Sequence, residues 1–171
     1  MIYRTLAMLL LMPLHSFSQK SILDKGFKNI AESKEVAVVV VNVLTNNIFQ
    51  TFTQDIADLF KDEKGYNTNP SFFNTNFVKD GSFEKLFNAD RYKIKKLKLT
   101  DNLDFLCLGK YSLISTNRND MDMISVDIKL QINFIDVKSG AVVDSRIYLQ
   151  KGIGISKIEA EKNATERILL Q

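Results

Sequence analysis

Histidine and cysteine are almost absent from this chain of 171 residues, which holds one of each. The histidine, His15, lies in a stretch that we expect to be cut away, so the mature protein has no imidazole for acid–base chemistry or zinc binding. Cys107 has no partner for an internal disulfide, and it lies in an apolar run that predicts a buried hydrophobic residue. We therefore expect no catalytic residue, no metal and no cofactor.

The first residues have the features of a secretory signal peptide. Arg4 gives a positive start, Leu6–Leu14 is an apolar run too short to span a bilayer, and Ser16 and Ser18 are small residues typical of a cleavage site. We expect residues 1–18 to be removed. No cysteine stands at that point, which argues against a lipid anchor, and no later run reaches the roughly twenty apolar residues of a transmembrane helix. The sequence thus predicts an exported protein, periplasmic or secreted, that is not lipid-anchored.

Length and charge limit the number of domains and the kinds of partner that we expect for the rest of the chain. We expect a short helical lead-in over residues 19–34 and a single domain over residues 35–171. The formal net charge of the whole sequence is only +3. A nucleic-acid binder would need a strongly basic face, so we expect no nucleic-acid partner.

Two segments carry strong strand patterns. Val36–Leu44 is a continuous β-branched run, which predicts a central strand buried on both faces. Residues 124–134 alternate between apolar and polar, which predicts a long strand with one buried face. The tight turn Lys138–Gly140 then leads into residues 141–150, so the two segments should form an antiparallel hairpin. A strand near Phe105–Ser115 is expected before them.

Helices are expected between and after these strands. Asn47, answered by Gln50, should cap a helix that ends at Gly65, and a second short helix should follow the turn before Ser82. The closing helix should begin at the capping box of Ser156 and Glu159.

Small residues flank that closing helix. Ala160 and Ala164 should let it approach the sheet closely, and the glycines of Gly152–Gly154 should let the chain turn sharply from strand to helix. The pattern as a whole predicts an α/β fold: a mixed sheet of about five strands with helices on both faces, the closing helix lying near the first strand.

Four segments of the chain form a recognisable set: EVAVVVVN at 35–42, DFLCLG at 104–109, IDVKSGAVVDS at 135–145, and GIGIS at 152–156 before an alanine-bearing helix. In this order they resemble the CsgG-like domains of the bacterial cell envelope, whose structural relatives include the amino-terminal domain of TolB and the LpoB activators of peptidoglycan synthases. The resemblance implies an anticodon-binding-domain-like fold and a non-enzymatic role through contacts with other envelope proteins. The chain departs from the group in lacking an anchoring cysteine and pore-forming hairpins.

One local cluster of basic residues is a candidate contact surface. Two interpretations remain: the solvated face of an ordinary element, or a contact for lipid headgroups, an acidic polymer or an acidic partner. The Asn-rich loop at Asn67–Asn76 is a second candidate. The cluster consists of Arg91, Lys93, Lys95, Lys96 and Lys98.

Several motifs resemble parts of catalytic or ligand-binding sites but differ from the full patterns of those sites. Ser82–Lys85, Ser115–Asn117 and Lys138–Gly140 spell the signatures of penicillin-binding transpeptidases, yet such domains are much larger and space these elements far more widely. Gly152–Gly154 lacks the third glycine and later acid of a dinucleotide site. The polar residues of Asn117–Asp122 miss the calcium-loop pattern and are better explained as a hairpin connection.

We therefore expect a non-enzymatic exported protein that binds another envelope protein, as an accessory factor in assembly or secretion. The alternatives are a small peptidoglycan-active or other envelope hydrolase, and a carrier of lipid or a small molecule. A deep pocket lined by acids would favour catalysis, an apolar cavity would favour carriage, and a flat exposed apolar patch would favour a protein partner. The sequence leaves homo-oligomerisation undecided.

Overall fold

The structure is a computed structural model that describes residues 34–170. The expected signal peptide over residues 1–18 lies outside this range, as does the expected lead-in helix except for Lys34. No helix among the described residues combines the length and the apolar character needed to cross a membrane.

The centre of the molecule is a mixed six-stranded sheet with the order β2-β1-β4-β5-β6, in which the short β3 lies beside β1. β1 pairs in parallel with β3 and β4, whereas the β4–β5 and β5–β6 pairs are antiparallel. The predicted hairpin is therefore confirmed. The strands are β1 (Glu35–Asn42), β2 (Asn47–Ile48), β3 (Asn67–Asn69), β4 (Phe105–Arg118), β5 (Ile124–Asp136) and β6 (Ala141–Gly154).

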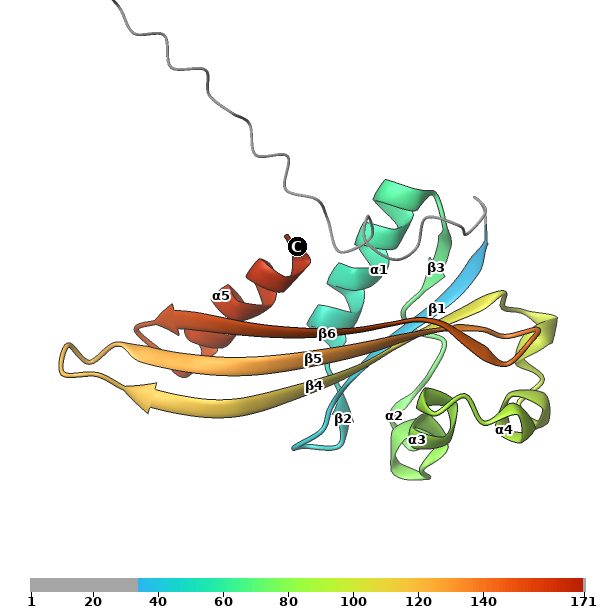
Figure 1. The fold of residues 1–171 in the computed structure, drawn as a ribbon, viewed down its shortest axis with the longest axis horizontal. Coiled ribbons are helices and arrows are strands. Elements are labelled where there is room, and N and C mark those ends of the chain that lie inside the picture. The colour runs from blue at the N-terminus through green and yellow to red at the C-terminus, as the bar shows by residue number, and fades with distance from the viewer. Residues whose placement is uncertain (1–33, 171) are drawn as a thin grey trace, which may run out of the picture.

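Helices cover both faces of this sheet, as predicted (Figure 1). We call the face under α1 (Gln50–Lys64) and α5 (Lys157–Leu169) the inner face. The opposite, outer face is covered at one end by short helices. These are α2 (Thr75–Lys79), α3 (Ser82–Phe87), α4 (Arg91–Lys96) and the 3₁₀ turn η2 (Leu99–Asp101).

β1 is buried on both faces, as its β-branched run predicts. Val36, Val38 and Val40 join the inner core, while the residues between them pack with α2, α3 and α4 on the outer side. The alternation in β5 is also confirmed, because Ile128 and Leu130 are fully buried under the inner-face helices while the polar residues between them are only partly buried. Two hydrophobic cores thus share one sheet.

The closing helix lies elsewhere than predicted. α5 packs on β5 and β6, and it is α1 that covers β1. The reason is connectivity: β6 ends at Gly154, and α5 begins three residues later, so the helix folds straight back over the strand it follows. The cap at Ser156 is confirmed, because Ser156 Oγ accepts the N–H of Glu159 at 3.2 Å. The Glu159 carboxylate accepts the N–H of Ile155 at 2.9 Å, one residue before the position that a capping box requires.

The two glycines before α5 serve close packing and not a sharp turn, which corrects the prediction. Both Gly152 and Gly154 lie within β6. A Cβ placed on Gly152 would overlap the carbonyl oxygen of Ala160 and lie 2.7 Å from the backbone nitrogen of Ala164. The helix backbone therefore rests directly on these glycines, with the two buried alanines facing the sheet.

The start of α1 also differs from the prediction. Asn47 belongs to β2, and α1 begins after Phe49 without a side-chain cap. Its first turn is tied to β1 instead: the Phe49 N–H donates to the Val40 carbonyl at 2.8 Å, and Thr53 Oγ1 accepts the Val40 N–H at 2.9 Å. The end at Gly65 is confirmed, since this residue has a φ of 67° and donates its N–H to Lys61.

The strands differ greatly in length. β1 has 8 residues, whereas β4, β5 and β6 have 14, 13 and 14. At about 3.3 Å per residue, the longer strands continue some 20 Å past the end of β1. β1 pairs with β4 only as far as Tyr111, so residues 112–118 of β4 form the start of a three-stranded extension, seen reaching past α5 in Figure 1.

Candidate protein-contact surface and helix groove

A bare apolar patch lies on the outer face along β6 and the extension, where α2, α3 and α4 do not reach (Figure 1). We call Ile114, Ile147, Leu149 and Ile153 the outer patch; their exposed fractions are 56%, 57%, 66% and 45%. The register places the three β6 residues opposite Gln131, Lys129 and Ser125 of β5, on the polar side of that strand. The result is a flat surface of isoleucine and leucine among polar groups.

Polar side chains border Ile114 and Leu149 and separate them from Ile153. Asp127 accepts a hydrogen bond from Ser115 Oγ at 2.6 Å and lies 3.6 Å from the Lys151 ammonium. These groups border a shallow hollow between Ile114 and Leu149. An apolar centre with a polar border is the usual arrangement of a protein-binding surface.

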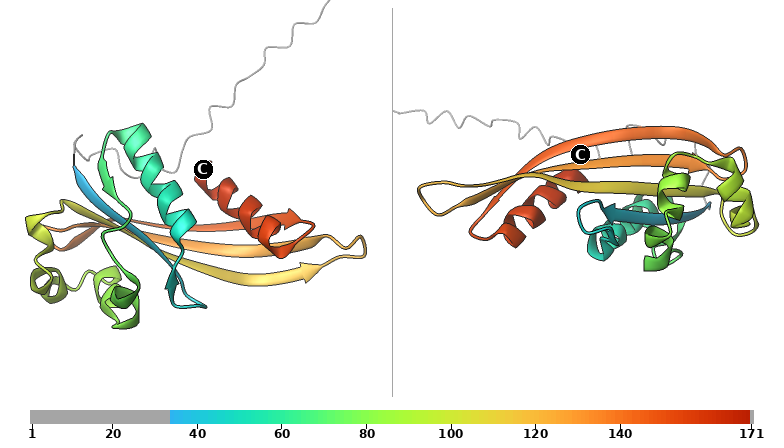
Figure 2. Two further views of the ribbon diagram at one scale, coloured as in Figure 1. Left: turned by 180° about the vertical axis from the view of Figure 1, so that it is seen from behind. Right: turned by 90° about the horizontal axis from the view of Figure 1, so that it is seen from below.

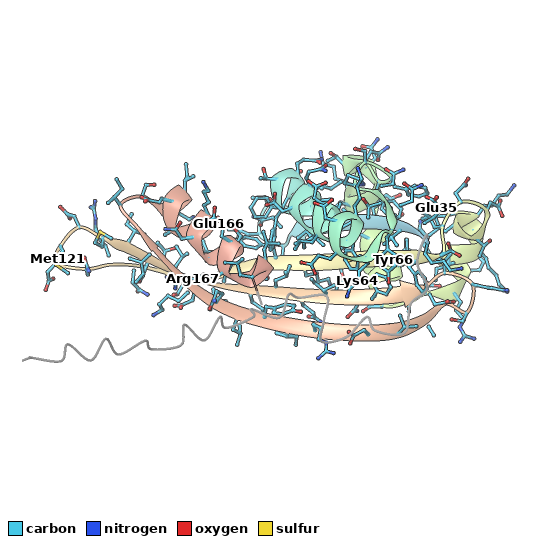
Figure 3. All side chains as sticks on the ribbon, turned by 90° about the horizontal axis from the view of Figure 1, so that it is seen from above. Glu35, Lys64, Tyr66, Met121, Glu166 and Arg167 are labelled. Atoms are coloured by element: carbon cyan, nitrogen blue, oxygen red, sulfur yellow. The ribbon has the colours of Figure 1, made fainter. Side chains whose placement is uncertain are left out.

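The free edge of β6 is covered only in part. Asn163 Nδ2 donates to the carbonyl of Ile153 at 2.8 Å, and Arg167 Nη1 donates to that of Lys151 at 3.0 Å. Because these carbonyls are two residues apart, they point to one side of the strand, away from β5. Figure 3 shows Arg167 on the β6 side of α5. Near the other end of the strand, Asp144 Oδ1 accepts the Ser145 N–H at 2.8 Å. We call Ser145–Leu149, which the side chains of α5 do not reach, the open edge.

β4 has a second free edge beyond the end of β1, but this edge is irregular. A bulge between Leu113 and Ser115 places Ile114 out of register with β5. Bulges of this kind spoil the regular spacing that another strand would need for pairing. At the tip, marked by Met121 in Figure 3, Asn119 Oδ1 accepts the N–H groups of Met121 and Met123, so its polar side chain builds the predicted hairpin connection.

The inner face holds a groove of about 550 Å³ between α1 and α5. We call it the helix groove. Its apolar lining includes Phe49, Phe52 and Leu169, and its polar lining includes Asp55 and Glu166. Burial raises the pKa of Asp55, and the nearby charges of Asp58 and Glu166 raise this pKa further.

One partly buried hydrogen bond involves Glu161, which lines the groove. The Tyr111 hydroxyl donates to Glu161 Oε2 at 3.0 Å. Burial, followed by the charge and the hydrogen bond of Glu161, raises the pKa of Tyr111, so the phenol stays protonated. Glu161 also lies 3.7 Å from Lys157, and Glu166 lies 3.6 Å from Lys162.

The basic cluster lies on α4 and the residues just after it. Asp90 caps this helix by accepting the Lys93 N–H at 3.1 Å, and Ile94 anchors it in the outer core. Helical spacing places Arg91 and Lys95 on one side and Lys93 and Lys96 on another. Lys98 follows with a φ of 50°. The five residues therefore do not share one face, and their role in binding stays a prediction.

The Asn-rich segment has local structural roles. Asn67–Asn69 forms β3 beside β1, and Asn74 Oδ1 accepts the N–H of Phe77 at 3.2 Å to cap α2. Asn69 Oδ1 accepts the Ser71 N–H in the turn between them. Its asparagines are thus largely explained by the fold.

The transpeptidase motifs do not meet. Ser82 is buried with 1% exposure, and Ser115 pairs with Asp127, nine residues before the end of β5. Lys138 follows that end, so the second and third motifs are about 30 Å apart. Cys107 is buried as predicted, and burial raises the pKa of its thiol to about 12.

Sequence reasoning missed the outer patch, because the patch depends on a register shift in the hairpin. Counted from the turn at Lys138–Gly140, an unbroken hairpin would place Ile147 opposite Leu130, on the buried side of β5. The shift between Phe134 and Ile135 places Ile147 opposite Gln131 instead, and no pattern in the sequence marked that shift. The helix groove had no signal either, because it depends on where two helices distant in sequence lie.

No protein-family model matches the sequence, and no curated protein matches it. Among solved structures, lipoprotein GNA1162 from Neisseria meningitidis has a TM-score of 0.51 at 14% identity, covering 73% of this chain and 86% of that one. The PelC dodecamer from Paraburkholderia phytofirmans gives 0.46 at 14% identity, covering 82% and 88%. The LpoB C-terminal domain from Salmonella enterica gives 0.39 at 9% identity, covering 71% and 85%. The chain is thus similar in fold to GNA1162.

Proposed function

We propose that this protein is a non-enzymatic, exported component of the bacterial cell envelope that binds another envelope protein through the outer patch. The observation that carries the proposal is the patch itself: four large apolar side chains lie exposed on a flat sheet surface that no described element covers. Exposed apolar surface of this kind marks interaction sites. The leader-like first residues and the fold similarity to a lipoprotein support the envelope location.

The arrangement of the helix groove supports a non-catalytic role. Its described lining includes carboxylates of the kind that hydrolases use, but Glu161 is already engaged by Tyr111 and Lys157, and Glu166 lies beside Lys162. Asp55 has a raised pKa and lies near Glu166, but Glu166 is the carboxylate that Lys162 pairs with. A paired acid and base would need two carboxylates free to face one substrate.

The same groove favours a second candidate function, carriage of an apolar ligand. Its volume of about 550 Å³ and its phenylalanine and leucine lining are within the range of small-molecule sites. A fluorescent acyl probe should then bind the purified chain and lose binding in Phe52→Lys, whose charge would lie in the apolar lining. Unchanged binding of the probe in this variant would rule out the helix groove as a carrier site.

The proposed function is tested by site-directed crosslinking in the native envelope. A photoreactive residue in place of Ile114 should capture one specific envelope protein, and Ile114→Lys should abolish co-purification of that protein. Leu44→Lys is the matched control, because Leu44 is also exposed and apolar but lies in the β1–β2 turn. Equal loss of co-purification in both variants, or no loss in either, would contradict binding through the outer patch.

A further inference from the structure

The open edge of β6 has geometry that suits a second copy of this chain. In Figure 2, β6 is the outermost strand of the sheet, and the strand order ends there. A strand at such an edge carries unpaired N–H and C=O groups that can pair with another strand. Natural edges are usually blocked by charge, bulges or covering elements.

Three features restrict where pairing can occur on this protein. The free edge of β4 is disrupted by the bulge at Ile114. The far end of β6 is covered, because Asn163 and Arg167 occupy the carbonyls of Ile153 and Lys151. At the other end of β6, its register with β5 shifts between Phe134 and Ile135. The open edge, Ser145–Leu149, is the regular stretch that remains.

We propose that two copies pair antiparallel at this edge, about a two-fold axis at Ile147. Two identical antiparallel strands that use only the open edge must place Ile147 opposite itself and Ser145 opposite Leu149 of the other copy. Ser145, Ile147 and Leu149 belong to the same alternating set as Lys151 and Ile153, whose carbonyls face away from β5. In this register Ile147 pairs its N–H and C=O with those of its own copy, and the Leu149 N–H meets the Ser145 carbonyl. The Ser145 N–H exchanges its hydrogen bond with Asp144 Oδ1 for one with the Leu149 carbonyl.

The side chains are complementary in the same register. On the inner face, Arg146 lies opposite Tyr148 of the other copy, where a guanidinium can rest on an aromatic ring. Asp144 lies opposite Gln150, which can donate to its carboxylate. On the outer face, Ile147 meets its own copy, and Leu149 meets Ser145. No like charges are directly opposed. The Arg146–Tyr148, Asp144–Gln150 and Leu149–Ser145 pairs each occur twice because the interface is symmetric, and the Ile147 pair on the axis occurs once.

The edge pairing does not depend on the envelope partner. Backbone pairing uses the rim of β6, whereas Ile114 lies on β4, two strands away. The joined sheet would contain the outer patches of both copies on one continuous face. A failed crosslink at Ile147 would therefore leave the proposed function standing, and a failed capture at Ile114 would leave the pairing standing.

Cysteine crosslinking of the full chain tests the register. Opposed Cα atoms in such a pair are about 5.5 Å apart, within disulfide range. Ile147→Cys should therefore give a disulfide-linked dimer under mild oxidation. Ser145→Cys alone should give none, because its copies would lie about 13 Å apart. A mixture of Ser145→Cys and Leu149→Cys should crosslink. Cys107 should not interfere, since it is buried and the pKa of its thiol is raised to about 12.

Sedimentation supplies the second readout. The unmodified chain should show a concentration-dependent dimer, and Ile147→Lys should remove it by opposing two like charges. Ile114→Lys, the same change at a similarly exposed residue, should leave it intact. Failure of Ile147→Cys to crosslink, equal crosslinking by Ser145→Cys, or a monomer at every concentration would each overturn the proposal.

Discussion

Replacing Gly152 by alanine should loosen the closing helix from the sheet. A Cβ at this position would overlap the Ala160 carbonyl oxygen and lie 2.7 Å from the Ala164 nitrogen and 2.8 Å from its Cβ. Two of these three neighbours are backbone atoms, so no side-chain rotation can relieve the overlap. α5 must move as a unit, or the β6 backbone beneath it must shift.

The magnitude follows from what the helix buries. Overpacking of a well-packed core usually costs about 1–3 kcal/mol. Complete undocking sets the upper limit: burial of Ile168 is worth roughly 1.5–3 kcal/mol, and the methyls of Ala160 and Ala164 add about 0.8 kcal/mol each. We therefore expect the free energy of unfolding to fall by about 2–4 kcal/mol.

Urea unfolding followed by circular dichroism measures this loss. With a slope of about 1–3 kcal/mol per molar urea, the midpoint should drop by roughly 1–2 M. Gly65→Ala is the control, because its φ of 67° carries strain but its Cβ meets nothing within 4 Å. That variant should lose only about 1 kcal/mol. A Gly152→Ala protein within about 0.5 kcal/mol of the parent would refute the close-packing argument.

Three further substitutions test single polar groups. Thr53→Val should cost about 1–3 kcal/mol in urea unfolding, because it leaves the buried N–H of Val40 without an acceptor, and Thr53→Ser should restore most of the loss. Asn133→Leu should also cost about 1–3 kcal/mol, since Asn133 Nδ2 donates a hydrogen bond to the Phe87 carbonyl and so connects the sheet to α3. An unchanged urea midpoint would argue against a stabilising role for this hydrogen bond. Asp55→Asn should stabilise the protein at neutral pH, because a raised pKa means that the fold disfavours the charged carboxylate. This stabilisation should vanish below pH 3.8, the ordinary aspartate pKa, because Asp55 is then protonated in the folded and in the unfolded protein. Stabilisation that persists at lower pH would contradict the assignment of the effect to the Asp55 charge.

Much of the fold was predictable from local pattern, and the parts that were not depend on long-range position. The alternation in β5 and the turn at Lys138–Gly140 fix a hairpin, because side-chain period and loop length both constrain register. Gly152 lies before the closing helix, as predicted, but it permits close packing of that helix and not a sharp turn. Its sequence context shows a glycine before a helix, whereas its function depends on how closely that helix folds back.

The candidate sites depend on features that local pattern did not mark. The exposure of Ile147 and Leu149 results from the register shift between Phe134 and Ile135, because the unshifted hairpin would turn both side chains to the inner face. The partial cover of the β6 edge requires knowing that Arg167 reaches back to Lys151 across the strand. The helix groove exists because α1 and α5 pack on different strands of the sheet. The prediction placed α5 near β1, which would leave no space between the two helices.

Strand length explains why this protein has an exposed apolar surface on its outer face. The outer-face helices lie in the connection between β3 and β4, so they can cover only the part of the sheet near β1. β4, β5 and β6 continue well beyond that part, and α5 covers their extension on the inner side alone. Ile114 lies in this extension, so its exposure depends on β4 continuing past the end of β1. The sequence keeps Ile114, Ile147 and Leu149 on the exposed side, which is costly for solubility unless a partner covers them.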